Sequence, residues 1–142
     1  MTQSRQAPTA DELLANATVI KAMEEAWLDS LPDDPMQRHE EGGWIYANIL
    51  TGELSTRRAP RGMLARLDVS GPPAVSDAVV VGTFHTHPNP SSEGWDPMPS
   101  PGDQSCAASS GVPWLVRADD GFHSTGPVSR RGGLQGNVGY PA

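Results

Sequence analysis

The sequence has little of several features that mark common protein classes. Its 142 residues include a single cysteine, Cys106, so no internal disulfide can form, and a reducing cytoplasm is the default expectation. No apolar run approaches the ~20 residues needed to cross a bilayer, and residues 1–9 lack the apolar segment of a secretory signal. We therefore predict a cytoplasmic protein.

Positive charge is also scarce. Ten Lys and Arg residues oppose 17 Asp and Glu residues, which gives a formal charge of −7. Nucleic acids and anionic membrane surfaces bind clustered positive charge, so we expect neither a nucleic-acid partner nor a membrane partner. Four arginines at positions 57, 58, 61 and 66, with no acidic residue among them, could hold an acidic tail or a carboxylate. Arg57, Arg58 and Arg61 are predicted to form a solvated sheet edge that deters aggregation, with the binding of a substrate tail as the alternative.

Turn-forming residues, in contrast, are abundant: the chain has 15 glycines and 14 prolines. The length suits one domain with one modest core. Within a single domain over 1–142, we distinguish an N-terminal helix and loop (1–39), a core (40–127) and a loosely ordered tail (128–142).

Apolar patterns divide this chain into helices and strands. Residues 10–30 carry apolar side chains at helical spacing, which predicts one amphipathic helix with a capping box of Thr9 and Glu12. A hairpin is predicted over 43–56 around Thr51-Gly52. The continuous apolar run 78–84 is typical of a strand buried on both faces. The other predicted elements are a strand or short helix at 63–69, a helix from Ser100, and a hairpin over 112–124.

Two histidines follow the buried strand directly, in His85-Thr86-His87-Pro88. Side chains i and i+2 of a strand point to the same side, so the two imidazoles converge. Two neutral imidazoles with a carboxylate suit Zn²⁺, and Asp103 is the candidate third ligand. Three protein ligands leave the fourth position open for water, as in catalytic zinc sites. A nearby carboxylate must then accept the proton of that water, and Glu40 and Glu41 are the candidates.

Taken together, these residues resemble the JAMM motif of the JAB/MPN-domain metalloproteases. The resemblance covers His85-Thr86-His87-Pro88, Ser100-x-x-Asp103 and Glu40-Glu41-Gly42-Gly43, and so extends over about residues 40–127. In particular, the chain looks like the bacterial branch found near toxins and other conflict systems. The resemblance implies an α/β fold of JAB/MPN (cytidine-deaminase-like) type, in which a curved, mixed, mostly antiparallel sheet is flanked by helices.

By this resemblance, His85, His87 and Asp103 would bind Zn²⁺. Glu40 would activate the bound water, since its position relative to the following glycines matches the family better than that of Glu41. Ser100 would donate a hydrogen bond to the oxyanion, although a serine followed by Pro101 is also what a helix start requires.

One segment departs from the family pattern. Twelve residues, 88–99, separate His87 from Ser100, where the family usually has seven. Its prolines predict an irregular loop insertion beside the open zinc position, where Trp95 and Met98 would influence the choice of substrate.

The function implied by the resemblance is zinc-dependent hydrolysis of a peptide or isopeptide bond. The partner would be a protein or peptide substrate, with ubiquitin-like proteins and toxins as candidates. The alternative is a zinc-containing module that binds without cleaving, such as an immunity or adaptor protein of a bacterial conflict system. The presence of both Glu40 and Ser100 favours the enzyme. An iron oxygenase with two histidines and one carboxylate is disfavoured, because it needs several open positions on the metal.

Overall fold

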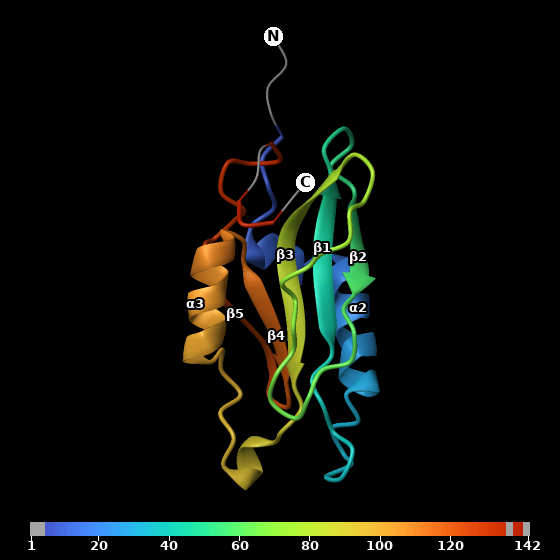
Figure 1. Ribbon diagram of the computed structural model, residues 1–142, viewed down its shortest axis with the longest axis vertical. Coiled ribbons are helices and arrows are strands. Elements are labelled where there is room, and N and C mark those ends of the chain that lie inside the picture. The colour runs from blue at the N-terminus through green and yellow to red at the C-terminus, as the bar shows by residue number, and fades with distance from the viewer. Residues whose placement is uncertain (1–4, 136–137, 141–142) are drawn as a thin grey trace.

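A five-stranded mixed sheet forms the centre of the fold (Figure 1). The computed structural model describes residues 5–135 and 138–140. In sequence order the strands are β1 (Gly42–Asn48), β2 (Leu54–Arg58), β3 (Ala78–His87), β4 (Trp114–Ala118) and β5 (Gly121–Thr125). In space their order is β2-β1-β3-β4-β5, and every neighbouring pair is antiparallel except β3 and β4. The expected α/β class with a mixed, mostly antiparallel sheet is therefore confirmed.

Strand β3 is the central strand, and both of its faces are covered. Every residue from Ala78 to Thr86 is buried, as the apolar run predicts. On one face, Val79 and Val81 pack with the helices α1 (Ala10–Leu14) and α2 (Ala17–Asp29). On the other face, Val80 belongs to a second apolar cluster that includes Ala107 of α3 (Pro101–Ser110). The two histidines at the end of β3 are thus held by a strand that is anchored along its whole length.

Helix α3 supplies the crossover that joins the parallel pair β3 and β4, because parallel strands cannot be joined by a tight turn. It begins after Ser100, as predicted, and ends at Gly111, which adopts the left-handed conformation with a φ of 74°. This crossover brings the first turn of α3 back to the end of β3, and Figure 1 shows the helix standing beside the sheet.

Two helices replace the single helix predicted over 10–30. The capping box of Thr9 and Glu12 is confirmed, but α1 ends at Leu14. The side chain of Asn16 accepts hydrogen bonds from the backbone N–H groups of Thr18 and Val19 and starts α2 anew. Asparagine competes in this way for backbone donors and favours caps over helix interiors.

The prediction for residues 63–69 is wrong, because they form neither a strand nor a helix. A single isolated bridge joins Met63 to Arg66, and the segment continues as an extended loop. Two side chains of β1 bind the later part of this loop. The Trp44 Nε1–H donates a hydrogen bond to the Val69 carbonyl at 2.9 Å, and the Tyr46 hydroxyl donates one to the Pro73 carbonyl at 2.6 Å. The loop therefore crosses one face of the sheet instead of joining its edge.

The description of 128–142 as a loosely ordered tail also needs correction for the described residues. The backbone N–H of Ala10 donates to the Val128 carbonyl at 2.7 Å, and Leu134 and Tyr140 are buried. Leu134 joins the apolar cluster beneath α1 and α2 because burying a large apolar side chain stabilises the fold more than leaving it in water. Among the described helices, none has both the length and the apolar character required to traverse a bilayer.

Candidate metal centre

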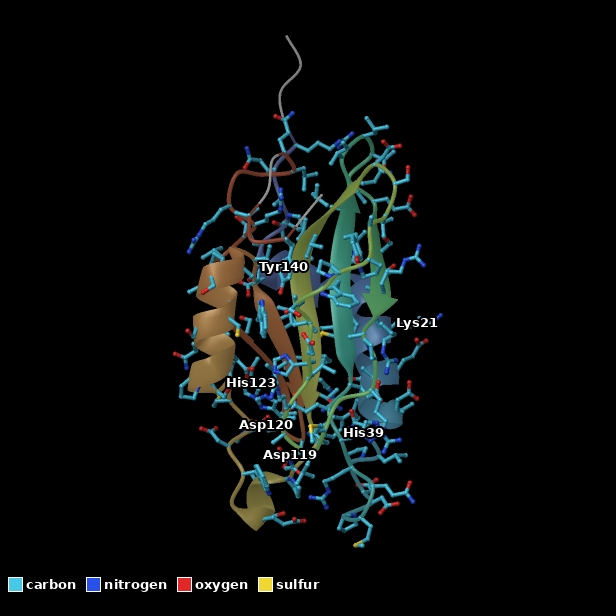
Figure 2. All side chains as sticks on the ribbon, viewed as in Figure 1. Lys21, His39, Asp119, Asp120, His123 and Tyr140 are labelled. Atoms are coloured by element: carbon cyan, nitrogen blue, oxygen red, sulfur yellow. The ribbon has the colours of Figure 1, made fainter. Side chains whose placement is uncertain are left out.

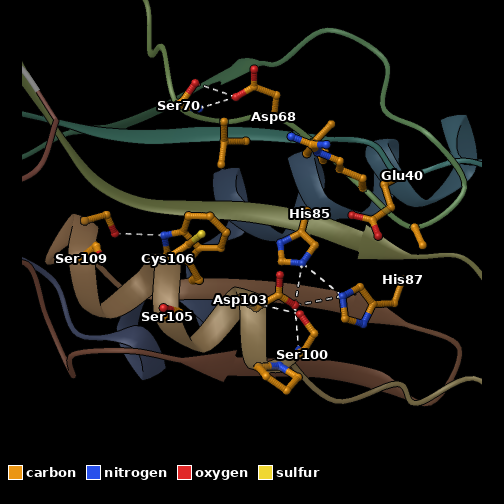
Figure 3. Close-up of a pocket in the computed structure, with 18 of the residues that line it drawn as sticks. Glu40, Asp68, Ser70, His85, His87, Ser100, Asp103, Ser105, Cys106 and Ser109 are labelled. Carbon is orange, nitrogen blue, oxygen red and sulfur yellow. Dashed lines mark hydrogen bonds and ion pairs between the residues drawn. The ribbon is translucent and has the colours of Figure 1, made fainter.

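Three potential metal ligands meet where β3 ends and α3 begins (Figure 3). The Nε2 atoms of His85 and His87 lie 3.1 Å apart, and each lies 3.2 Å from Oδ2 of Asp103. His85 is buried, and the other two side chains are half-buried. The structure therefore brings together all three residues that the sequence analysis proposed as ligands.

The spacing of these three atoms is that of metal ligands. Zinc binds nitrogen and oxygen at about 2.0–2.1 Å, so two ligands at the tetrahedral angle lie roughly 3.3 Å apart. The observed separations of 3.1 and 3.2 Å are close to this value. Two imidazole nitrogens and a carboxylate oxygen are also a donor set that zinc accepts. The group could hold a metal ion, and the identity of that ion does not follow from the geometry.

Asp103 is ionised in this arrangement. Burial alone would raise the pKa of its carboxyl group, but the hydrogen bonds from His85 and His87 and from the backbone N–H of Ser100 hold that pKa well below its usual range. For His87, burial lowers the pKa and the hydrogen bond with Asp103 raises it, and the balance is a raised pKa. The negative charge of Asp103 is thus available for a cation.

Glu40 and Glu41 lie in different environments. Glu40 is 7% exposed and lines the same cleft as the triad, with its carboxylate directed toward the histidines (Figure 3). Burial raises the pKa of Glu40 to about 7, and electrostatic interaction with His85 and His87 opposes that shift. A carboxylate with a pKa near neutrality can both accept and release a proton, which general acid–base chemistry requires.

Glu41 instead belongs to a buried polar cluster away from the cleft. Its Oε1 accepts a hydrogen bond from Arg58 at 2.7 Å, and its Oε2 lies 2.5 Å from Nε2 of His39. Arg58 also pairs with Asp29 of α2. His39 is buried in this cluster. Arg58 is exposed on the edge strand β2, as the prediction of a solvated edge requires, and its ion pairs with Glu41 and Asp29 also connect it to the fold.

The two glycines after these glutamates permit a close approach of strands. A Cβ atom on Gly42 would lie 2.1 Å from the carbonyl oxygen of Phe84, and one on Gly43 would lie 1.9 Å from that of Arg57. Side chains at either position would force β1 away from its neighbours. The pair thus allows β1 to pack tightly beside β3, with Gly42 opposite His85, and this register places Glu40 beside the histidines.

Ser100 caps helix α3 and also lines the cleft. Its Oγ accepts a hydrogen bond from the Asp103 backbone N–H at 3.0 Å, and its own N–H donates to Oδ2 of Asp103 at 2.9 Å. This capping box confirms the structural role that the sequence predicts. The hydroxyl hydrogen remains available for a second acceptor, because a hydroxyl group can donate while it accepts.

The segment 88–99 forms one rim of the cleft. It contains a short 3₁₀ helix, η1 (Ser91–Glu93), where the sequence analysis expected no regular structure. Glu93 forms a two-point ion pair with Arg38, at 3.1 and 3.2 Å. Trp95 and Met98 are 40% and 50% exposed and line the cleft, as the prediction requires. The loop is therefore tied to the body of the fold and presents two apolar side chains at the site.

The cleft extends well beyond the triad and has a volume of about 940 Å³. The loop 65–70 lines one side of the cleft and α3 another (Figure 3), and Tyr140 also contributes to the lining. Sequence reasoning missed residues 65–70 and Tyr140, since nothing local in the sequence places them at this cleft. The remaining histidine, His123, lies in the middle of β5, and its Nε2 is 2.7 Å from Oδ1 of Asp120 (Figure 2).

Comparisons with known proteins add no relative to this description. No protein-family model, no curated protein sequence and no solved structure matches the chain.

Proposed function

We propose that this protein is a zinc-dependent hydrolase of peptide or isopeptide bonds, of the JAB/MPN type, with a protein or peptide as substrate. The single observation that carries the proposal is the placement of Glu40. The buried carboxylate of Glu40 lines the same cleft as three atoms spaced as zinc ligands. A metal site with no catalytic role has no need for such a group beside it.

Each residue of the site has a task in this reaction. His85, His87 and Asp103 would hold the zinc ion, which lowers the pKa of a bound water to about 7 and polarises a carbonyl oxygen. Glu40 accepts a proton from the attacking water and delivers it to the leaving amine. Ser100 donates its hydroxyl hydrogen to the oxygen that becomes negatively charged. Cys106 forms no bond to the substrate, because the nucleophile is water.

The path of the chain through the site supports this proposal. A buried central strand that ends in two ligands, followed by a crossover helix that starts with Ser100 and brings Asp103 back, is the arrangement that the JAMM motif implies. The non-catalytic binding module also requires the triad, but it requires neither Glu40 nor the hydroxyl group of Ser100.

The test compares the zinc-loaded wild type with the Glu40→Gln variant on a panel of coumarin-amide peptides and isopeptide-linked lysine conjugates. We expect cleavage by the wild type, inhibition by a chelator, and a loss of about 10²–10⁴-fold in kcat for the variant with zinc content unchanged. If the zinc-loaded wild type cleaves no member of the panel, the proposal of hydrolysis is overturned in favour of the binding module.

A further inference from the structure

Arg66 is a cation inside the cleft that lacks a partner among the described residues. Three described arginines have no side-chain hydrogen bond or ion pair to another described residue, namely Arg57, Arg66 and Arg131, and Arg66 is the one that lines the cleft. Its charge acts on Asp68 through space, yet the two side chains form no ion pair. Asp68 is bonded instead to the backbone and hydroxyl of Ser70.

The backbone around Arg66 is fixed relative to the candidate metal centre. The N–H of Met63 donates to the Arg66 carbonyl at 2.7 Å, which closes a small turn. Two hydrogen bonds join that turn to Glu40, one from the Glu40 N–H to Met63 at 2.7 Å and one from Gly62 to the Glu40 carbonyl at 2.9 Å. On the other side, the Asn89 side chain donates to the Leu64 carbonyl at 2.8 Å. The turn that contains Arg66 is therefore attached to two chain segments. One carries the general base Glu40, and the other contains Asn89 and follows the ligand histidines.

The charges around Arg66 are of the opposite sign. Four carboxylate residues line the described part of the cleft, namely Glu40, Asp68, Asp96 and Asp103. Away from the candidate metal centre, Asp68 and Asp96 would repel a substrate carboxylate, and the guanidinium group of Arg66 would attract it. A guanidinium group binds a carboxylate through two parallel hydrogen bonds, a geometry that lysine lacks.

We propose that Arg66 binds a carboxylate of the substrate beside the scissile bond, so that the preferred substrate carries a negative charge close to the bond that is cleaved. This inference rests on the proposed function, because it takes the triad as the place where the bond lies. The carboxylate is either the terminal carboxylate of the chain or an acidic side chain, and the chemistry of recognition is the same for both.

Three small probes test the inference without a known substrate. Each carries a mercaptoacetyl group, whose thiolate binds zinc, joined to one amino acid: alanine with a free carboxylate, alanine amide, or aspartic acid amide. Calorimetric titration of the zinc-loaded protein gives the three dissociation constants. The variants are Arg66→Gln, Arg66→Lys and, as the matched control, Arg57→Gln, which removes an equally exposed arginine outside the cleft.

We expect at least one carboxylate probe to bind the wild type about tenfold more tightly than alanine amide, as suits a charged hydrogen bond at a partly hydrated site. The probe that shows the preference identifies the source of the carboxylate. Arg66→Gln should abolish the preference and leave the binding of alanine amide unchanged, Arg66→Lys should retain part of it, and Arg57→Gln should retain all of it.

Three results would overturn the inference. Equal affinities for the acid and amide probes in the wild type would mean that Arg66 contacts no carboxylate. A preference that survives Arg66→Gln would mean that the carboxylate chelates zinc. A preference lost equally in Arg57→Gln would reflect overall charge. In all three cases alanine amide still binds zinc, so the metal centre stands, whereas failure of every probe to bind would overturn both proposals.

Discussion

Substitutions of the two adjacent glutamates should have opposite effects on stability, because Glu40 is buried beside the triad, whereas the buried Glu41 pairs with Arg58 and contacts His39. In the metal-free protein the pKa of Glu40 is about 7, against an ordinary value of 4.5. Each pKa unit corresponds to about 1.4 kcal/mol, so ionised Glu40 costs the folded state about 3 kcal/mol. The Glu40→Gln variant removes this cost above pH 7 and should unfold at a higher urea concentration than the wild type.

The sign of the pH dependence follows from proton linkage. Between pH 4.5 and 7 the folded state retains the proton of Glu40 while the unfolded state releases it, so the unfolding free energy of the wild type falls as the pH rises through this window. Above pH 7 both states are ionised and the slope vanishes. The difference between Glu40→Gln and the wild type cancels the contributions of groups that Glu40 does not influence, and it should grow by about 3 kcal/mol across the window. It retains the contribution of His87, whose pKa the Glu40 charge raises.

Glu41→Gln should be destabilising at neutral pH. The substitution removes the charge that Arg58 and His39 contact at 2.7 and 2.5 Å, and hydrogen bonds of charged groups contribute about 1.5–3 kcal/mol each at most. Hydrolysis should be nearly unchanged in this variant, because Glu41 does not line the cleft.

Urea unfolding from pH 5 to pH 8.5, in the presence of a chelator, measures all three proteins. Adding zinc provides an internal control, because a cation beside Glu40 favours its ionised form and should reduce the advantage of Glu40→Gln. The reasoning is refuted if Glu40→Gln and Glu41→Gln destabilise the protein equally, or if the difference between Glu40→Gln and the wild type does not change with pH.

Three further predictions concern the metal, the rim and the strand contact. Metal analysis of purified protein should find about one zinc ion per chain. His85→Ala should lose most of the zinc, whereas His123→Ala should retain it, because His123 lies outside the triad. Equal zinc content in both variants would refute the site. Trp95→Ala should raise KM severalfold at constant zinc content and little changed kcat, as loss of uniform substrate binding does, whereas a loss of zinc would show that the rim is structural. In the same urea assay, Gly43→Ala should lower the unfolding free energy by more than about 3 kcal/mol, because the added Cβ would lie 1.9 Å from a backbone oxygen. Gly71→Ala is the control and should be nearly neutral, because a Cβ at Gly71 meets no atom within 4 Å.

Several parts of the site follow from local sequence. The apolar run before His85 is long enough to predict a buried strand, and the two-residue alternation of a strand then brings His85 and His87 to one side. Ser100 and Asp103 follow from helix capping, because the capping box sets the orientation of both residues within a single turn. Such features depend on neighbours within a few positions, so the sequence alone predicts them.

What only the tertiary structure decided is the relation between segments far apart in the chain. Adjacent residues of an extended segment point to opposite sides, so the local pattern shows that Glu40 and Glu41 differ, and only the family resemblance favours Glu40 as the one that faces the histidines. That choice depends on pairing with β3, where Gly42 lies opposite His85 and the Glu41 N–H donates to Thr86. Arg66 enters the cleft for the same kind of reason, since backbone hydrogen bonds attach its turn to Glu40. Contacts across tens of residues arise from packing and strand register, which no local pattern encodes.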